Sequence, residues 1–209
     1  MLIKNLHNYL TNVRGAIHVG GHFGEEASWY HENGFTRVLW FEPCFSSYEV
    51  LVRNIEAYPN QKAFQFGIHD TLTNAVLHIA SNAGESSSIL QLGKHKIYHP
   101  EVRYVGQEEI LLHRLDWVFN AFKIDIKDFN FLNVDVQGAE LNVIRSFGEG
   151  ITGMNYIYTE VNVEELYEGC SLIHEVDEYL SKFAFKRVLT EMTKANWGDA
   201  LYVKEEKDE

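Results

Sequence analysis

The sequence is poor in cysteine and has no long hydrophobic run. Its two cysteines, Cys44 and Cys170, lie far apart in a chain of 209 residues, which favours free thiols in a reducing compartment over a disulfide framework or a cysteine metal site. No apolar run approaches the length of a membrane span, and the first fifteen residues lack the continuous apolar stretch of a signal peptide. We therefore expect a soluble chain in the cytoplasm, without a membrane as partner.

Positive charge is also scarce. The 18 lysines and arginines face 30 acidic residues, which gives a formal net charge of −12 at pH 7. Binding of nucleic acid without sequence preference requires a cationic face that displaces counterions from the phosphates. We therefore expect no nucleic-acid partner, although the composition leaves room for a local basic patch.

Apolar residues are plentiful and alternate between strand-like and helix-like patterns. They make up 45% of the sequence, enough for the core of one domain over residues 1–209. The pattern predicts strands at residues 16–20, 38–42, 63–68, 75–80, 109–114, 129–136, 155–161, 185–191 and 200–203. It predicts helices at residues 25–33, after Pro43, at 116–122, at 139–147 and after Ser171. Strands separated by helices imply an α/β fold with a mostly parallel sheet covered on both faces, and the last two strands are close enough to form a hairpin.

Two helix starts carry a serine at a capping position. Ser46 and Glu49 have the spacing of a capping box for the helix after Pro43. Ser171 precedes the amphipathic stretch near the carboxyl end, and we expect its hydroxyl to cap that helix.

Residues 81–107 show no clear period, and a segment of this length without regular structure is usually functional or disordered. It contains two histidines and a local basic cluster, namely His95 and His99 with Lys94, Lys96 and Arg103. Such a cluster could attract an anionic substrate or consist of ordinary solvated charges. We expect the last six residues, 204–209, to form a solvated tail.

A glycine-rich turn follows the first predicted strand. Gly20-Gly21-His22-Phe23-Gly24 leads directly into a helix, where glycines allow a sharp turn and the helix start offers free N–H groups to a ligand. The dinucleotide fingerprint is absent because its second glycine falls on His22, and no Gly-Lys-Ser/Thr of a phosphate-binding loop follows. Glu42 ends the second strand, 22 residues after Gly20, the position of an acid that binds the hydroxyls of a ribose. A plain tight connection is the alternative for the turn, and stabilisation of the next helix start is the alternative for Glu42.

Acidic and amide side chains follow the later strands. Asp135 and Glu160 lie at the ends of two neighbouring predicted strands, with Gln137, Glu140 and Asn162 close to them. Because ligands of such sheets bind at the carboxyl ends of the strands, we expect these groups to face one crevice. They are suited to orient a hydroxyl or remove its proton, or to hold a divalent cation such as Mg²⁺. For Glu140, capping of the following helix is an equal alternative.

The stretches IHVGGHFGEEASWY, VLWFEPCFSSYEVLVRNI and FLNVDVQGAELNVIRSF occur in this order along the chain. Together they resemble the FkbM family of S-adenosylmethionine-dependent methyltransferases, and the similarity extends from about residue 15 to residue 203. The resemblance implies the class I methyltransferase fold, a doubly wound, Rossmann-like sheet of seven strands whose last strand is antiparallel. It also implies S-adenosyl-L-methionine as the cofactor.

The resemblance also implies site residues. The residues implied for cofactor binding lie in the loop after the first strand, at the acid that binds the ribose, in the turn beside the adenine and at the end of the fourth main strand. They are Gly20, Gly21, His22, Gly24, Glu42, Gly67, Ile68, Asp70 and Asp135. Asp135 and Glu140 match the Asp-x-x-Gly-x-Glu signature of the family. One position departs from the family, because His18 stands where an aspartate commonly helps to bind the methionine end of the cofactor, and histidine lacks the fixed negative charge.

Members of this family typically methylate an oxygen, often a hydroxyl on a sugar or a natural-product scaffold. We therefore expect a small-molecule acceptor, with the acids Asp135, Glu160 and Glu140 as the catalytic candidates and His95 or His99 as alternative bases. Residues 81–107 would form a lid that excludes water, and selectivity would lie there and in residues 164–169. A nucleotide-dependent oxidoreductase and a non-catalytic binding module of the same fold are the alternatives, and the sequence indicates no oligomeric state.

Overall fold

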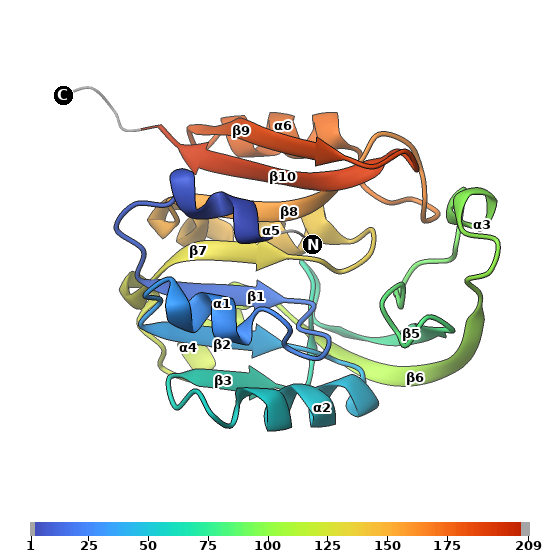
Figure 1. Cartoon of the computed structure of the whole chain (residues 1–209), viewed down its shortest axis with the longest axis horizontal. Coiled ribbons are helices and arrows are strands. Elements are labelled where there is room, and N and C mark those ends of the chain that lie inside the picture. Colours follow the sequence, from blue (N-terminus) through green and yellow to red (C-terminus); the bar gives the residue numbers. More distant parts are fainter. Residues whose placement is uncertain (1–2, 206–209) are drawn as a thin grey trace.

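A seven-stranded sheet forms the centre of the protein (Figure 1). In the computed structural model, which describes residues 3–205, its strands lie in the order β3–β2–β1–β7–β8–β10–β9. Their bounds are β1 (Gly15–Val19), β2 (Arg37–Phe41), β3 (Gln61–Phe64), β7 (Phe129–Val134), β8 (Tyr156–Asn162), β9 (Phe185–Met192) and β10 (Trp197–Lys204). Neighbours from β3 to β8 pair in parallel, and β10 is antiparallel to both β8 and β9. The doubly wound sheet with an antiparallel last strand and the closing hairpin are thereby confirmed.

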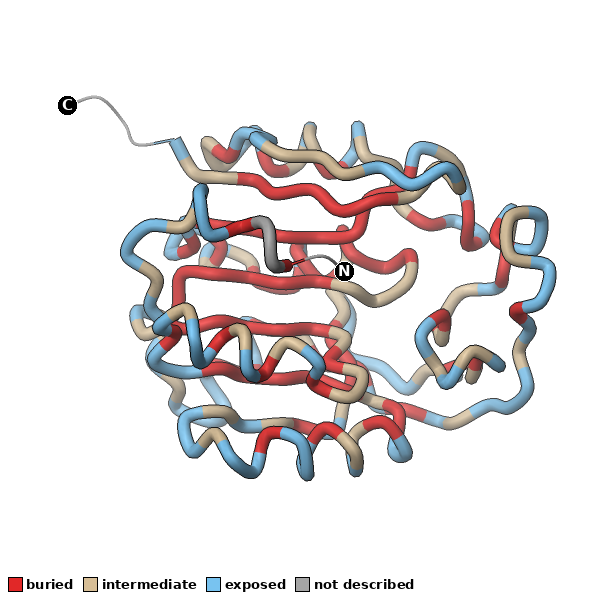
Figure 2. The backbone as a smooth tube through the Cα atoms, in the orientation of Figure 1, coloured by how far each residue is buried: buried red, intermediate tan, exposed pale blue. Residues whose placement is uncertain are grey.

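Helices cover both faces of this sheet (Figure 1). One face carries η1 (Ile3–Asn8), α1 (Ala27–Glu32) and α2 (Phe45–Ile55), and the other carries α4 (Leu115–Ala121), α5 (Glu140–Arg145) and α6 (Ile173–Ser181), near the short turns η2 (Ile126–Asp128) and η3 (Gly148–Gly153). Alternate residues of the central strands enter two separate cores, as Ala16 and Ile17 of β1 do. Every residue of β1, β7 and β8 is buried (Figure 2), as expected for parallel strands covered on both sides. No helix among residues 3–205 is long and apolar enough to cross a membrane.

A second, smaller sheet lies at the carboxyl end of the first. It consists of β4 (Gly67–Ile68), β6 (Tyr104–His113) and β5 (Thr73–Ala80) in this order. The prediction of one strand over residues 63–68 is wrong, because β3 ends at Phe64 and β4 pairs with β6 instead of β2. Phe64 stacks on Phe41 of the main sheet, and Phe66, already beyond β3, still contacts the same ring.

The two predicted serine caps are wrong. Two other acids accept from the N–H groups at the start of α2. Cys44 N–H, at the N-cap, donates to Glu42 just after β2 (2.8 Å), and Phe45 N–H donates to Glu108 of β6 (3.1 Å). Ser46 therefore lies inside the first turn of α2, which begins at Phe45. The later helix begins at Ile173, two residues beyond Ser171, and its N-cap residue is Leu172.

The segment between β5 and β6 is shorter than predicted and is held by contacts to the loop after β8. Strand β6 begins at Tyr104, and residues 81–103 contain one short helix, α3 (His95–Tyr98). Gly93 N–H and His95 N–H donate to the Leu166 carbonyl oxygen (2.8 and 3.1 Å). Apolar side chains of both segments form a small cluster of their own, built around Leu92, Leu166, Tyr167 and Cys170. Of the predicted tail, Lys204 belongs to β10, and residues 206–209 lie outside the described residues.

The turn after β1 is a sensitive point of the fold. Gly20 has a φ of +86°, and a Cβ there would overlap the carbonyl oxygen of Asp135. We expect Gly20→Ala to lower the free energy of unfolding by about 3 kcal/mol, measured by urea denaturation. Gly34→Ala is the matched control, since Gly34 has a φ of +79° but nothing within 4 Å of its Cβ position; it should lose only about 1 kcal/mol. Equal losses in the two variants would contradict the overlap at Gly20.

Candidate functional site

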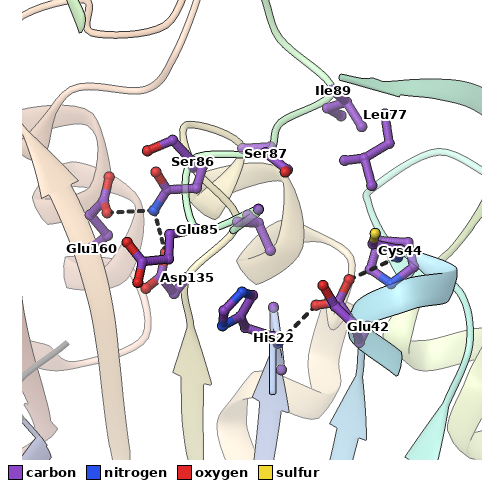
Figure 3. A pocket seen from close by; sticks show the side chains of 18 of the residues that line it. His22, Glu42, Cys44, Leu77, Glu85, Ser86, Ser87, Ile89, Asp135 and Glu160 are labelled. Carbon is purple, nitrogen blue, oxygen red and sulfur yellow. Dashed lines mark hydrogen bonds between the residues drawn. The ribbon is translucent and has the colours of Figure 1, made fainter. Parts of the chain in front are cut away.

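A cavity of about 690 Å³ opens at the carboxyl ends of β1, β2, β7 and β8 (Figure 3). This is where ligands bind in open α/β sheets, and the volume suits a small molecule. Residues 82–102 and the loop after β8 form its outer wall, opposite the strand ends. The cavity therefore combines two predicted features, the strand-end crevice and the long segment.

The glycine turn closes one side of the cavity. Gly20 N–H and Gly21 N–H both donate to the carbonyl oxygen of Phe41 at the end of β2 (2.9 and 3.0 Å). His22 N–H donates to Glu42 Oε2 (2.8 Å). Gly20, Gly21 and His22 line the cavity, whereas Gly24 lies behind them, where its Cβ position is 2.6 Å from Leu51.

Glu42 is a buried carboxyl just after β2, and within residues 3–205 its hydrogen bonds are to backbone groups only. Oε1 accepts from Cys44 N–H and Oε2 from His22 N–H, each at 2.8 Å. Burial raises its pKa to about 7, against the opposing effect of these two hydrogen bonds. A carboxylate has about four lone-pair positions, so two N–H donors leave Glu42 capacity to accept from ligand hydroxyls.

The His22 side chain faces protein groups. Nδ1 bonds to Glu25 (2.8 Å) and Nε2 to the carbonyl oxygen of Ala83 (3.1 Å). Burial lowers the pKa of His22, but these hydrogen bonds raise it further, to about 9. The ring is therefore charged at neutral pH, donates from both nitrogens, and fastens the glycine turn to the start of the outer wall.

One end of the cavity is apolar. Gly67 and Ile68 line it together with apolar residues of the small sheet and its neighbours, namely Cys44, Leu77, Ile110 and Leu112. Asp70, which was grouped with Gly67 and Ile68 from the sequence, is not among the lining residues. Its Oδ2 instead accepts from the amide of Asn142 (3.1 Å).

The other end is acidic (Figure 3). Asp135 follows β7 and Glu160 lies in β8, and both line the cavity. Burial raises the pKa of each carboxyl, and the charge of Asp135 raises the pKa of Glu160 further. Within residues 3–205, no group of three or more His, Cys, Asp or Glu side chains is arranged to hold a metal ion.

Two predicted groups at this end serve the surrounding structure. Glu140 accepts from the N–H groups of Val136 and Gly138 (3.1 and 2.9 Å) and is not among the cavity-lining residues. These bonds hold the turn before α5, whose N-cap residue is Ala139 and which has no side-chain cap within the described part of the chain, so the structure does not show the capping alternative. Asn162 is completely buried at the end of β8 and also lies outside the cavity lining.

His18 borders the cavity as a neutral ring. It stacks on Trp40, with ring centroids 4.4 Å apart, and its Nδ1 lies 3.1 Å from the hydroxyl of Tyr30. Burial lowers its pKa to about 3, so the position carries no charge of either sign at neutral pH.

Two lining residues had no signal of their own in the sequence. Glu26 follows the glycine turn, and burial raises its pKa to about 7. Tyr167 comes from the predicted selectivity segment and donates its hydroxyl to Gln137 Oε1 (2.6 Å). His95 and His99 also line the outer wall, with ring centroids 4.9 Å apart, so the structure brings both histidines to the cavity.

Comparisons with known proteins give one consistent result. A family model described as the methyltransferase FkbM domain matches residues 18–187. The 2-O-methyltransferase NoeI of Sinorhizobium fredii (strain NBRC 101917 / NGR234) is 28% identical over 154 residues, which cover 70% of this chain and 62% of NoeI. The methyltransferase sdnD of Sordaria araneosa is 29% identical over 134 residues, 54% of this chain and 52% of sdnD. The chain thus spans less than two thirds of either relative.

Solved structures share the fold. The ribosomal protein L11 methylase of Lactobacillus delbrueckii subsp. bulgaricus superimposes with a TM-score of 0.55 at 11% identity, covering 96% of this chain and 75% of that chain. TrmK of M. capricolum, solved with S-adenosyl-homocysteine, gives a TM-score of 0.51 at 6% identity, covering 96% and 66%. At such identities the likeness shows the fold alone.

Proposed function

The chain belongs to the FkbM methyltransferase family, and on this premise we propose that it transfers a methyl group to a hydroxyl of a sugar or a related small molecule. The observation that carries the proposal is the acid pair Asp135 and Glu160, which lies in the same cavity as Glu42 but at its other end (Figure 3). Such an arrangement separates a place for the cofactor from a place where a hydroxyl can lose its proton.

The cofactor of the family is S-adenosyl-L-methionine, and the residues of the cavity fit it. Glu42 would accept from the ribose hydroxyls with its remaining lone pairs. The apolar end beside Gly67 and Ile68 would take the adenine ring, and the turn at Gly20 and Gly21 would adjoin the methionine part. His18 adds no charge there, and Glu26, the N-cap residue of α1, also lines the cavity.

The chain's own contribution to the reaction is alignment and proton removal. When bound, S-adenosylmethionine supplies an electrophilic methyl group whose leaving group is a neutral thioether. Asp135 takes the proton of the acceptor hydroxyl while the oxygen of that hydroxyl forms its bond to carbon. The outer wall, fixed by the bonds of His22 to Ala83 and of Gly93 to Leu166, excludes water from this end.

The acceptor side has the composition of a sugar site. Aromatic rings line it alongside the acids, namely His95, His99, Tyr167 and Trp197. Rings offer flat apolar surfaces to a pyranose, while carboxyl and hydroxyl groups bond to its hydroxyls. The relative NoeI is named a 2-O-methyltransferase, which supports oxygen as the methylated atom.

Calorimetry followed by a transfer assay tests the proposal. We expect micromolar binding of S-adenosylmethionine and S-adenosylhomocysteine and none of NADH, whose binding in their place would indicate a nucleotide-dependent oxidoreductase. Transfer is then measured with methyl-labelled cofactor on a panel of methyl glycosides, with and without Mg²⁺, and with an RNA transcript as control. Cofactor binding without transfer to any glycoside would contradict the proposal and mark a non-catalytic binding module.

A further inference from the structure

The Gln137 side chain is fixed at every polar atom. Its Nε2 donates both hydrogens, one to Asp135 Oδ1 (2.6 Å) and one to Glu160 Oε2 (2.9 Å). The side-chain Oε1 accepts from the Tyr167 hydroxyl (2.6 Å), and the backbone carbonyl oxygen of Gln137 accepts from Ser88 Oγ (2.7 Å). Through its side chain and its backbone, Gln137 thus joins two acids at strand ends to both segments of the outer wall.

The backbone of Gln137 is held in an unfavourable conformation. Its φ is +58°, in the left-handed region that side chains other than glycine rarely adopt, and Gly138 follows with a φ of +110°. Such conformations persist where the surroundings enforce them, and they concentrate at functional sites. Here the four hydrogen bonds of Gln137 enforce it.

A neutral amide is the group that this position requires. Asp135 and Glu160 both lie within hydrogen-bond distance of one nitrogen, and Glu140 and Asp199 are further acids whose charges act on Glu160. Two acids at such separation do not both ionise readily. A glutamate at position 137 would add another acid, whereas the amide supplies two N–H donors and no charge.

We infer that Gln137 is a positioning residue that holds Asp135 and Glu160 as a two-pronged receptor for a vicinal diol, two hydroxyls on neighbouring carbons of the acceptor. The inference rests on the proposed function. Gln137 uses one oxygen of each acid, and within residues 3–205 no hydrogen bond engages the other oxygen of either. In this receptor Asp135 accepts from the reacting hydroxyl. Glu160, whose pKa is raised by burial and by the charges of Asp135, Glu140 and Asp199, is the acid assigned to donate to the neighbouring hydroxyl.

The acceptor requirement is tested with a matched pair of methyl glycosides. One carries the diol, and the other has hydrogen in place of the neighbouring hydroxyl. We expect wild-type protein to prefer the diol by at least about 100-fold in kcat/KM, because the deoxy compound leaves a buried polar group unpaired. Gln137→Leu should lower kcat for the diol by about 10- to 100-fold and abolish most of this preference, with unchanged affinity for S-adenosylhomocysteine. Gln65→Leu, at an exposed glutamine outside the cavity, is the control.

A variant Gln137→Leu that keeps both the rate and the preference would overturn the inference. If wild-type protein methylates neither glycoside, the proposed function fails. The positioning role of Gln137 is then tested by a measurement that needs no acceptor. Carbon-13 NMR of carboxyl-labelled protein then follows the titration of the acid pair. Loss of the two N–H donors should move this titration to higher pH in Gln137→Leu, with Glu140 and Asp199 present in both proteins, and an unchanged titration would refute the role of Gln137.

Discussion

Replacing Asp135 with asparagine should slow methyl transfer by about 10²- to 10⁴-fold and change the affinity for S-adenosylhomocysteine only a few-fold. The asparagine keeps the shape of the side chain and one oxygen for the amide of Gln137, which is 2.6 Å from Asp135 Oδ1. It cannot take up the proton of the acceptor hydroxyl. Single-turnover rates with methyl-labelled cofactor, combined with calorimetry, separate the two effects.

Asp70→Asn is the matched control for this variant. Asp70 also follows a strand of the structure, but its carboxyl bonds to Asn142 and is not among the cavity-lining residues, so we expect neither transfer nor binding to change. An Asp135→Asn protein that loses rate and affinity in equal measure would assign Asp135 to the cofactor instead of the acceptor.

Replacing Glu42 with glutamine should weaken the binding of S-adenosylhomocysteine by about 10- to 100-fold, the cost of losing hydrogen bonds to a charged group. Both oxygens of Glu42 accept from backbone N–H groups, at 2.8 Å each. The amide NH₂ of glutamine would face one of these donors, so the variant also disturbs the turn at His22. Its unfolding is therefore measured beside its affinity, and Glu49→Gln, at an exposed acid of α2, serves as control.

The binding of wild-type protein should also depend on pH through Glu42. Burial raises the pKa of the free carboxyl to about 7, and hydroxyl donors of a ribose stabilise its charged form, so that binding releases a proton. Affinity should therefore rise between pH 6 and pH 8 in the wild type and rise less in Glu42→Gln. Glu26 is present in both proteins, and the pKa of His22 falls in the variant because the charge of Glu42 is one of the groups that raise it. The same pH dependence in both proteins would show that another group carries it.

The sequence predicts the main sheet well because its strands are buried on both faces. Runs such as Phe129–Val134 are mostly apolar, and a glycine turn or an acid marks the point where several of them end. Glu42, Asp135 and Glu160 could be placed from this pattern alone. The prediction of the fold follows from the order of apolar runs and turns along the chain, and the structure confirms this fold.

The outer wall could not be predicted in the same way. Residues 81–103 have no hydrophobic period, and their conformation depends on bonds to distant residues, such as that of His95 N–H to the Leu166 carbonyl. The side chains of His22 and Glu140 were assigned to the site by position, yet each has partners within the surrounding chain. The direction in which a side chain points is set by tertiary contacts, and the spacing of residues in a sequence does not reveal it.

The small apolar cluster of the outer wall has a consequence for the evolution of this chain. Leu92, Leu166, Tyr167 and Cys170 pack with one another and belong to neither of the two cores that flank the main sheet. Substitutions in the wall can therefore accumulate at little cost to the folding of the sheet, which also carries the strand-end acids. Apart from Tyr167, which bonds to Gln137, residues of this cluster can vary while Asp135 and Glu160 keep their places at the strand ends.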